Sequence, residues 1–314
     1  MRKFDHSYGY TLPSLLEVEP PIESQDFAHF WRSCFDGIKT LHPLPEIKHT
    51  GRQIGNFELY ELAFKSTNDI TIKGWLLLPS KLTVNKVFVV GHGYGGCDEP
   101  TDNLPIADAA YLFLCYRGIS SSAIDGVPEN PKYHVLYNIQ DRDSYILRGC
   151  VEDTWMAVSA AEALFPAAKE HIGFMGISFS GGIGALALPW DKRIKKAHLQ
   201  VPSFGHQPLR LELPSWGSAK SVQKFYRRHP EVDTVANLSY YDAAIAAAYI
   251  DVPVHIAAAL ADPVVAPPGQ FAIYNNLPPN KQLFVLEKGH SDYPLIQVEQ
   301  ANLLSELSMF FDDL

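Results

Sequence analysis

The pattern of hydrophobic and polar residues changes character near residue 80. Before that point, residues 57–64 and 70–78 form two strand-like runs, separated by a turn-prone Ser-Thr-Asn-Asp segment. We expect these two runs to pair antiparallel at the edge of a sheet. An earlier segment predicts one helix, because its apolar residues recur at helical spacing. These residues are Phe27, Phe30, Trp31, Cys34, Ile38 and Leu41.

Beyond residue 80, short and almost entirely apolar runs alternate with helical patterns. Such runs are typical of parallel strands that are buried on both faces by covering helices. One helix is expected between the second and third of them, and another closes the chain. The expected parallel strands span residues 87–90, 111–115, 172–175, 197–201, 254–259 and 283–286.

These elements predict an α/β fold with a mostly parallel central sheet, flanked by helices and bounded by the antiparallel pair. We expect one domain over residues 51–314, preceded by an extension over residues 1–50 with one helix packed on the core. No linker-like run of Gly, Ser or Pro divides the sequence. The connections 120–142 and 203–238 are longer than a strand–helix unit needs, and such excursions usually form lids, substrate walls or interfaces.

Composition narrows the classes of partner. Hydrophobic residues make up 46% of the 314 and charged residues 19%, as in an ordinary globular protein. A formal charge of −9 argues against nucleic acid or an anionic membrane surface as a partner. The sequence shows no run long enough to span a bilayer and no signal-peptide core, so we expect a cytoplasmic protein. Free thiols are then expected at Cys34, Cys97, Cys115 and Cys150.

A serine between small residues follows the third parallel run. The segment Gly176-Ile177-Ser178-Phe179-Ser180 leads directly into a helix-like stretch. A strand that turns sharply into a helix around a serine is typical of the nucleophile elbow of α/β-hydrolases. The turn requires small residues two before and two after the serine, and Gly176 and Ser180 satisfy this. Centring the turn on Ser180 also satisfies it, but we favour Ser178 because the elbow must follow the strand directly.

An acid and a histidine follow the last two expected strands, in the order that this fold requires. Asp262 comes first and His290 second, each at the carboxyl end of its strand and so at the edge where Ser178 lies. Asp251 is a rival acid, but it precedes its strand and would lie at the opposite edge. The order predicts that His290 takes the proton of Ser178 during attack on an ester carbonyl, while Asp262 orients the imidazole.

A glycine-rich segment, residues 91–96, follows the first parallel run. In a hydrolase, a backbone N–H of this loop is one arm of the oxyanion hole, and glycines allow the backbone to approach the reacting oxygen. We expect the N–H of Tyr94, beside Gly93, to donate to that oxygen together with the N–H of Phe179.

The same segment also matches the Gly-x-Gly-x-x-Gly pattern of dinucleotide-binding proteins. Asp98 and Glu99 follow it, however, where a pyrophosphate needs the amino terminus of a helix. In that alternative, Arg117 near the end of the next strand would serve a 2′-phosphate. His92 and Cys97 have no partners at metal-ligand spacing, so we expect neither a cofactor nor a metal, and a buried, hydrogen-bonded His92.

With these residues in view, the chain resembles the acetyl xylan esterase / cephalosporin C deacetylase family from about Asp26 to the carboxyl terminus. The matching segments are residues 30–31, 72–79, 92–96, 116–118, 176–180, 241–243, 260–262 and 289–290. The resemblance implies the α/β-hydrolase fold, the triad, and oxyanion donors at Tyr94 and Phe179. Supporting roles around the site are expected for Gly93, Arg117, Gly176 and Ser180.

Enzymes of this family remove acetyl groups from sugars and from related small esters. The resemblance therefore implies a serine carboxylesterase or deacetylase that acts on a small-molecule ester and forms an acyl-enzyme intermediate. It also implies a homo-oligomer, because similar enzymes assemble into rings through the loop after Arg117-Gly118. That loop is shorter here than in the family.

Three motifs depart from the family pattern. The family has Gln where this chain has Ile119, Gln and Gly where it has Phe179 and Ser180, and Glu where it has Ser291. No catalytic group is lost, but polar side chains become apolar or shorter. We therefore expect a more hydrophobic acyl or alcohol pocket.

Two other functions remain as alternatives. A peptidase of the prolyl-oligopeptidase group shares the fold and the triad order, but it ordinarily needs a further domain or a carboxylate-lined site for a peptide amine, and neither is evident. A non-catalytic binding protein on a hydrolase fold would be compatible with the altered elbow. A dehalogenase is disfavoured, because the elbow offers a serine rather than an aspartate.

Overall fold

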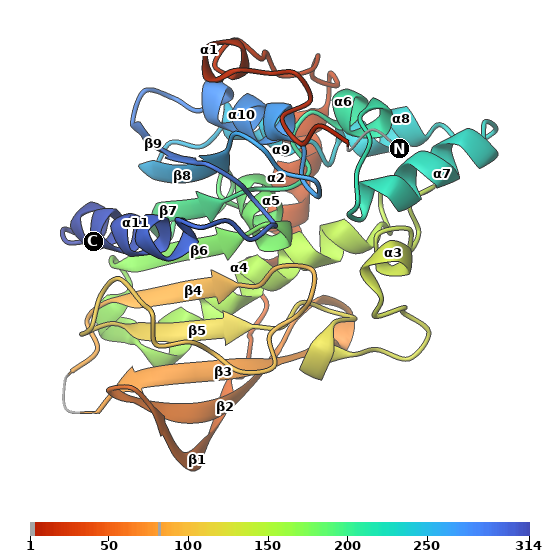
Figure 1. Ribbon diagram of the computed structural model, residues 1–314. Helices are drawn as coiled ribbons and strands as arrows, with labels where there is room; N and C mark the ends of the chain where they lie inside the picture. Colours follow the sequence, from red (N-terminus) through yellow and green to blue (C-terminus); the bar gives the residue numbers. More distant parts are fainter. Residues whose placement is uncertain (1–3, 81–82) are drawn as a thin grey trace.

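A nine-stranded sheet forms the centre of the computed structural model, which describes residues 4–80 and 83–314 (Figure 1). Residues 1–3 of the expected extension lie outside the described part. The strand order is β1-β2-β3-β5-β4-β6-β7-β8-β9, and the strands from β5 to β9 in that order run parallel. The strands are β1 (Glu46–Ile54), β2 (Phe57–Lys65), β3 (Thr71–Pro79), β4 (Val87–Gly91), β5 (Ala110–Leu114), β6 (Ile172–Ile177), β7 (Ile194–Gln200), β8 (Val254–Ala259) and β9 (Lys281–Leu286).

The expected antiparallel pair is present as β2 and β3, and a third strand extends it. β1 pairs antiparallel with β2 and forms the outer edge, while β3 pairs antiparallel with β5. Most side chains of β1 are exposed on both faces. Its sequence therefore lacks the alternation of apolar and polar residues that reveals a half-buried strand. Because β1 begins at Glu46, the sheet starts before the expected domain boundary at residue 50.

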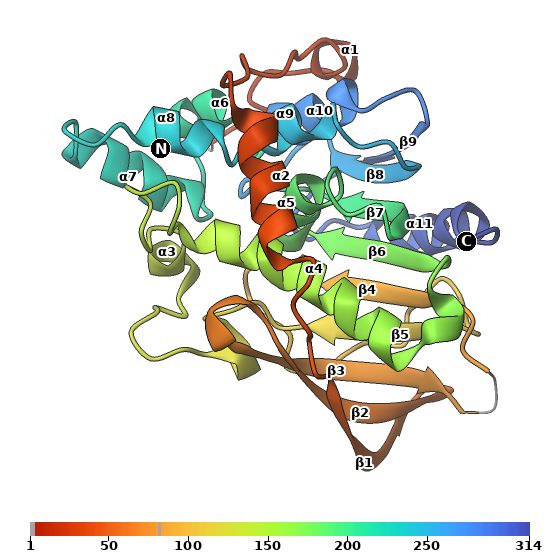
Figure 2. The ribbon, with the colours of Figure 1, turned by 180° about the vertical axis from the view of Figure 1, so that it is seen from behind.

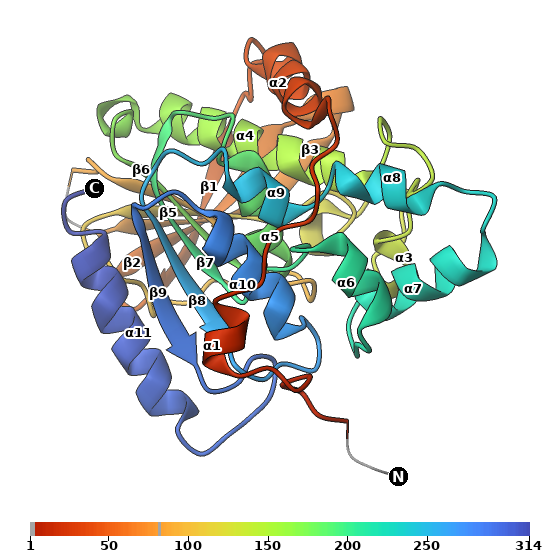
Figure 3. The ribbon, with the colours of Figure 1, turned by 90° about the horizontal axis from the view of Figure 1, so that it is seen from above.

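Helices cover both faces of the sheet (Figures 2 and 3). The carboxyl-terminal helix α11 packs on one face and the larger set, which includes α2, α4, α5, α9 and α10, on the other. The helices are α1 (Leu12–Leu15), α2 (Phe27–Ile38), α3 (Pro131–His134), α4 (Ile146–Leu164), α5 (Phe179–Ala187), α6 (Gln207–Glu212), α7 (Ala219–Arg228), α8 (Thr234–Ser239), α9 (Ala243–Ala247), α10 (Pro267–Asn276) and α11 (Ile296–Phe310). Within the two described ranges, no helix is long and apolar enough to cross a membrane.

The amino-terminal extension holds two helices rather than one, because the four-residue α1 precedes the expected helix α2. The indole N–H of Trp31 on α2 donates to the carbonyl of Tyr240 at 2.7 Å and anchors this helix on the core. The side-chain amide of Asn275 donates to the carbonyls of Leu15 and Val18, which holds the chain around α1 against α10.

Both long excursions lie at the end of the sheet towards which the parallel strands point (Figure 1). The first carries α3, and the second carries α6, α7 and α8. The carboxyl ends of parallel strands are where α/β folds hold their ligands. The excursions are therefore placed to border a site at this edge.

Candidate active site

Ser178 lies on a strained turn between β6 and α5. Its backbone has φ +53° and ψ −106°, a region that non-glycine residues rarely adopt. The turn is held by its own backbone: the N–H of Ser178 donates to the carbonyl of Gln200 at 2.8 Å, and its carbonyl accepts from the N–H of Ser203 at 2.9 Å. A side chain at Gly176 would come within 2.6 Å of the Ser180 carbonyl, so the turn requires glycine there.

Ser180 stands where the Gly-x-Ser-x-Gly pattern has its second glycine, and it closes the turn. Its hydroxyl accepts from the N–H of Ile177 at 2.8 Å and donates to the Ile177 carbonyl at 3.1 Å. Space for this side chain exists because Gly91 faces it, and any Cβ at Gly91 would overlap the side chain of Ser180. Ser180 is fully buried and its hydroxyl is engaged, so the structure separates it from the imidazole that reaches Ser178.

The structure brings Ser178, His290 and Asp262 together in one chain of hydrogen bonds. His290 Nε2 lies 2.9 Å from Ser178 Oγ, and His290 Nδ1 lies 2.7 Å from Asp262 Oδ2. Because a carboxylate only accepts, Nδ1 carries the proton and Nε2 is left to accept from the serine hydroxyl. This is the geometry in which an imidazole can act as a general base.

Asp262 is fully buried, and donors surround both of its oxygens. Oδ1 accepts from the N–H groups of Val264 and Val265 at 2.8 and 3.0 Å, and Oδ2 accepts from the amide of Gln270 at 3.1 Å. Gln270 is itself fully buried, and its polar atoms are all paired. Its amide also donates to the Val265 carbonyl, and its oxygen accepts from the N–H of Ala259. The carboxylate is thereby held in one orientation towards His290.

Sequence reasoning did not find Gln270, and it quoted Gly289 only as part of a matching segment, without its supporting role. A Cβ at Gly289 would overlap the carboxylate of Asp262, so only glycine allows His290 and Asp262 to approach each other. The rival acid Asp251 instead precedes β8, where it forms an ion pair with Lys192 at 2.7 Å.

The amino-terminal extension also contacts the acid. The backbone N–H of Asp262 donates to the carbonyl of His6 at 2.9 Å, and the hydroxyl of Tyr8 donates to the carbonyl of Pro214 at 2.7 Å. The extension therefore supports both the loop after β8 and the segment that follows α6. The sequence predicted only that one helix of the extension packs on the core.

The expected oxyanion donors, the backbone N–H groups of Tyr94 and Phe179, belong to two segments that lie close to Ser178. Phe179 is the first residue of α5, and Tyr94 follows Gly93 on the loop after β4. A hydrogen bond of 3.3 Å from the N–H of Ser180 to the carbonyl of His92 joins this loop to α5. Within residues 4–80 and 83–314, the N–H groups of Tyr94 and Phe179 form no hydrogen bond. Their role as oxyanion donors stays a prediction.

The side chains of Phe179 and Tyr94 belong to an aromatic cluster beneath the loop. Their rings lie 4.1 Å apart, and Phe179 also contacts the rings of Tyr116 and Phe204. The hydroxyl of Tyr94 donates to Nδ1 of His134 at 3.0 Å, because the other ring nitrogen of His134 donates to a backbone carbonyl. The cluster fixes the loop that carries the Tyr94 N–H.

His92 is buried and hydrogen-bonded as expected. Its Nε2 accepts from the N–H of Tyr116 at 3.1 Å, so Nδ1 carries the proton and donates to the Gly93 carbonyl at 2.6 Å. Burial lowers the pKa of His92 to about 4, although the bond to Gly93 works in the opposite direction. Both nitrogens are thus occupied, and no group of three or more metal-ligating side chains occurs among the described residues.

Arg117 stabilises the fold and is not placed to bind a phosphate. Its guanidinium is buried and donates to both oxygens of Asp153 at 3.0 and 2.6 Å, and to the hydroxyl of Thr67 at 2.8 Å. Burial acts to lower the pKa of Arg117, but the Asp153 carboxylate outweighs it and the pKa is raised. The group joins β5 to α4 and is not available to the 2′-phosphate of a dinucleotide.

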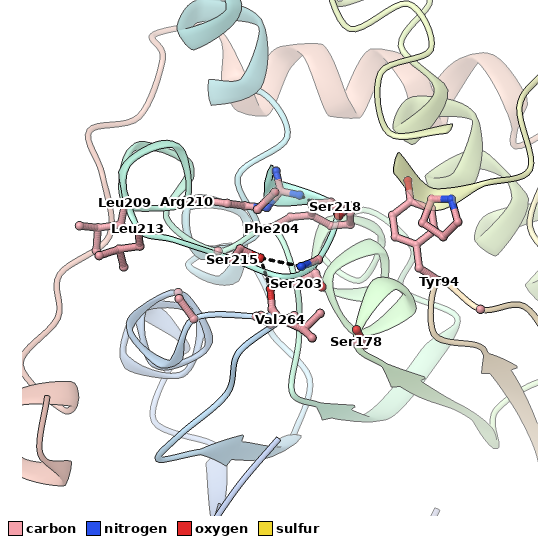
Figure 4. A pocket seen from close by; sticks show the side chains of 18 residues that line it. Tyr94, Ser178, Ser203, Phe204, Leu209, Arg210, Leu213, Ser215, Ser218 and Val264 are labelled. Atoms are coloured by element: carbon pink, nitrogen blue, oxygen red, sulfur yellow. Dashed lines mark hydrogen bonds between the residues drawn. The ribbon is translucent and has the colours of Figure 1, made fainter. Parts of the chain in front are cut away.

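A pocket of about 230 Å³ opens beside Ser178 (Figure 4). One side is the loop after β4, with Tyr94 and Gly95; another is the loop after β8, with Val264 and Val265. Pro131 of the first excursion and Ala266 and Gly269 at the start of α10 also line it, but the largest part of the wall comes from the excursion over 203–238, which therefore borders the site. Its contribution is Ser203, Phe204, Gly205, Leu209, Arg210, Leu213, Ser215, Gly217, Ser218 and Ala219.

We expected the residues that depart from the family pattern to make this pocket more hydrophobic. For two of them this prediction is wrong. Ile119 and Phe179 are buried in the core and do not line it. At the third position, the hydroxyl of Ser291 donates to the carbonyl of Gly289. The apolar lining comes instead from Leu209, Leu213 and the two valines after β8.

Comparison with known proteins gives a consistent family and fold. A model of the acetyl xylan esterase (AXE1) family matches residues 17–307. The chain is similar to the acetyl xylan esterase from Paenibacillus sp. R4, with 21% identity over 95% of this chain and 99% of that chain and a TM-score of 0.80. For acetyl xylan esterase 1 from Thermoanaerobacterium sp. JW/SL YS485, the identity is 20% over 97% and 99%, with a TM-score of 0.77.

The chain is also similar to the acylaminoacyl peptidase from Pyrococcus horikoshii. The identity is 16%, and the match covers 82% of this chain but only 42% of that chain, with a TM-score of 0.62. At these identities, the likeness to each solved structure shows a shared fold.

Proposed function

From the premise that the chain belongs to the acetyl xylan esterase family, we propose that it is a serine esterase that removes acetyl and other short acyl groups from small esters. The observation that carries the proposal is the chain of hydrogen bonds from Ser178 through His290 to Asp262, which opens onto a pocket. The altered elbow does not weaken it, because Ser180 replaces the missing glycine without displacing Ser178.

In the first step, Ser178 Oγ attacks the ester carbonyl and His290 Nε2 takes the hydroxyl proton. Asp262 stabilises the imidazolium that results. The carbonyl oxygen becomes an oxyanion, to which the N–H groups of Tyr94 and Phe179 donate. The amino terminus of α5 adds a favourable dipole at the same place.

The tetrahedral intermediate then collapses. The bond from the carbonyl carbon to the alcohol oxygen breaks, His290 returns its proton to the departing alcohol, and the acyl group remains on Ser178. Water enters, His290 takes one of its protons, and the hydroxide attacks the acyl carbon. Expulsion of Ser178 Oγ, which recovers the proton, releases the carboxylic acid and restores the enzyme.

Hydrolysis of p-nitrophenyl acetate and butyrate tests this proposal. Wild-type protein should hydrolyse both esters, and Ser178→Ala should lower kcat/KM by roughly 10³-fold or more while the far-UV circular dichroism stays unchanged. Equal rates for the two proteins would refute the nucleophile and favour a non-catalytic binding protein. Faster turnover of dipeptide amides than of esters would favour a peptidase.

A further inference from the structure

Arg210 places a positive charge on the wall of the pocket that Ser178 opens into. It lies on α6, it is partly buried, and it lines the pocket together with Tyr94 and Ser178. In Figure 4 the Arg210 side chain lies along the upper part of the pocket and Ser178 at its lower part. Its guanidinium carbon stands 5.0 Å from the centre of the Phe204 ring, which holds the group in place.

The guanidinium has more donors than the described residues use. It carries five N–H donors, yet only two hydrogen bonds are formed by its side chain within the described ranges. One goes to the hydroxyl of Ser218 at 3.1 Å and the other, at 3.4 Å, to the amide oxygen of Gln207. Both acceptors are neutral.

Within residues 4–80 and 83–314, Arg210 forms no ion pair, whereas the buried Arg117 and the half-buried Arg193 pair with Asp153 and Asp191. Asp242 acts to raise the pKa of Arg210 but does not bond to it. Its oxygens accept instead from the backbone N–H groups of His206, Gln207 and Ala244. Burial lowers the pKa of Arg210 and outweighs the opposite effect of Asp242, whereas the pKa values of the paired residues Arg117 and Arg193 are raised. Half-buried charges without a partner are costly, and such groups are commonly retained to bind a ligand.

We propose that Arg210 binds a carboxylate of the substrate, so that the enzyme prefers short esters that carry a negative charge. This inference rests on the proposed esterase function. A planar guanidinium matches a carboxylate through two parallel N–H···O bonds, and the apolar side chains of Leu209 and Leu213 would contact the short carbon chain between carboxylate and ester. The carboxylate belongs to the acyl part or to the alcohol part of the ester, and the two are separated by experiment.

Two pairs of esters show whether the carboxylate belongs to the acyl part or to the alcohol part. Within each pair, one ester carries a carboxylate where the other carries a methyl group. For the acyl part, monoethyl succinate is compared with ethyl butyrate; for the alcohol part, 4-acetoxybutanoate is compared with butyl acetate. Acid release at constant pH gives kcat/KM for all four. We expect the charged ester of at least one pair to be favoured about tenfold or more, which is the scale of one charge-assisted hydrogen bond. Added salt should reduce this preference.

Variants at position 210 assign the preference to this side chain. Arg210→Gln should lower the ratio of charged to neutral ester by about tenfold, mainly through KM of the charged ester, and Arg210→Lys should retain part of it. Arg228→Gln is the matched control, because it removes the same charge from the exposed face of α7, away from the Ser178 pocket, and should leave the ratio unchanged.

The outcomes separate this inference from the proposed function. Absence of turnover for all four esters would contradict the esterase itself. Turnover without a preference for either charged ester, or a preference that Arg210→Gln retains, would overturn the role of Arg210 alone. If Arg210→Gln does not fold, the wild-type ratios and their salt dependence, together with Arg210→Lys, still decide the matter.

Discussion

The backbone at Ser178 is strained, and its neighbours hold it in that state. A non-glycine residue in such a region costs on the order of 1–3 kcal/mol, which the surrounding structure must offset. Two backbone hydrogen bonds to Ser178 and the two-way bond between Ser180 and Ile177 meet this requirement. The result is a hydroxyl that faces the imidazole of His290 instead of the core.

Gln270 positions the acid of the triad, and its replacement tests this. Gln270→Leu should remove one donor from Asp262 and leave the N–H of Ala259 and the carbonyl of Val265 unpaired. Unpaired buried groups of this kind cost about 1–3 kcal/mol each. We expect a lower free energy of unfolding in urea and a lower kcat for p-nitrophenyl acetate, with little change in KM. An unaltered kcat would show that Asp262 needs no such support.

The three hydrogen-bonded residues of the candidate site could be predicted from the sequence, whereas those that support them could not. Ser178, Asp262 and His290 were found because each directly follows or soon follows an apolar run, in an order tied to one fold. Gln270 lies on a helix with no motif around it, and its role depends on how α10 packs under the acid loop. Gly289 was quoted as part of a resemblance, but its reason, the space taken by the Asp262 carboxylate, is visible only in three dimensions.

At the scale of elements, the excursion from β7 to α8 forms much of the substrate pocket. It is tied to the acid loop, since the hydroxyl of Ser215 donates to the carbonyl of Val264 at 2.8 Å and the N–H of Trp216 to that of Pro263 at 2.8 Å. A change in the excursion can therefore alter both the wall of the pocket and the loop that carries Asp262.

Leu209 on α6 is expected to limit the size of the ester. Leu209→Ala removes three carbon atoms from the pocket wall, and each buried CH₂ of a longer substrate then contributes about 0.8 kcal/mol. The ratio of kcat/KM for p-nitrophenyl hexanoate to that for the acetate should rise by about tenfold. Leu295→Ala, an exposed leucine outside this pocket, is the control. If both variants keep the wild-type chain-length profile, Leu209 does not limit the ester.

Two strands departed from the prediction because an apolar pattern is absent where they begin or along their length. β1 is an exposed edge strand, so its sequence carries no alternation. β7 begins at Ile194, earlier than expected, because Lys195 and Lys196 interrupt its apolar pattern. The short helices α6 to α8 were expected only as a long connection, since their polar faces border water or the site.

At the scale of the whole molecule, three buried histidines lie in the sheet or directly beside it. His92 lies under the glycine-rich loop, and His198 contacts His255 between β7 and β8 through their Nδ1 atoms at 3.1 Å. Burial lowers the pKa of His92 to about 4, and burial together with His255 also lowers that of His198. The folded protein keeps these rings neutral over a pH range where the unfolded chain takes up protons.

Stability should therefore fall as the pH is lowered from about 6.5 towards 4, because only the unfolded chain gains protons at these histidines. His92 alone would account for about 3 kcal/mol by pH 4. Asp242 acts in the opposite direction, since burial raises its pKa to about 6 and the folded protein gains a proton first. Urea unfolding between pH 7 and 4.5 should show a smaller loss for His92→Asn than for wild type. Identical losses would contradict this role of His92.

The most direct test of the whole account is covalent labelling with a fluorophosphonate, followed by fragment mass spectrometry of the segment that holds both serines. The account predicts one adduct on Ser178 in the wild type and in Ser180→Ala, a much slower adduct in His290→Ala, and none in Ser178→Ala. An adduct on Ser180, or one that persists in folded Ser178→Ala, would contradict the central claim that Ser178 is the nucleophile activated by His290.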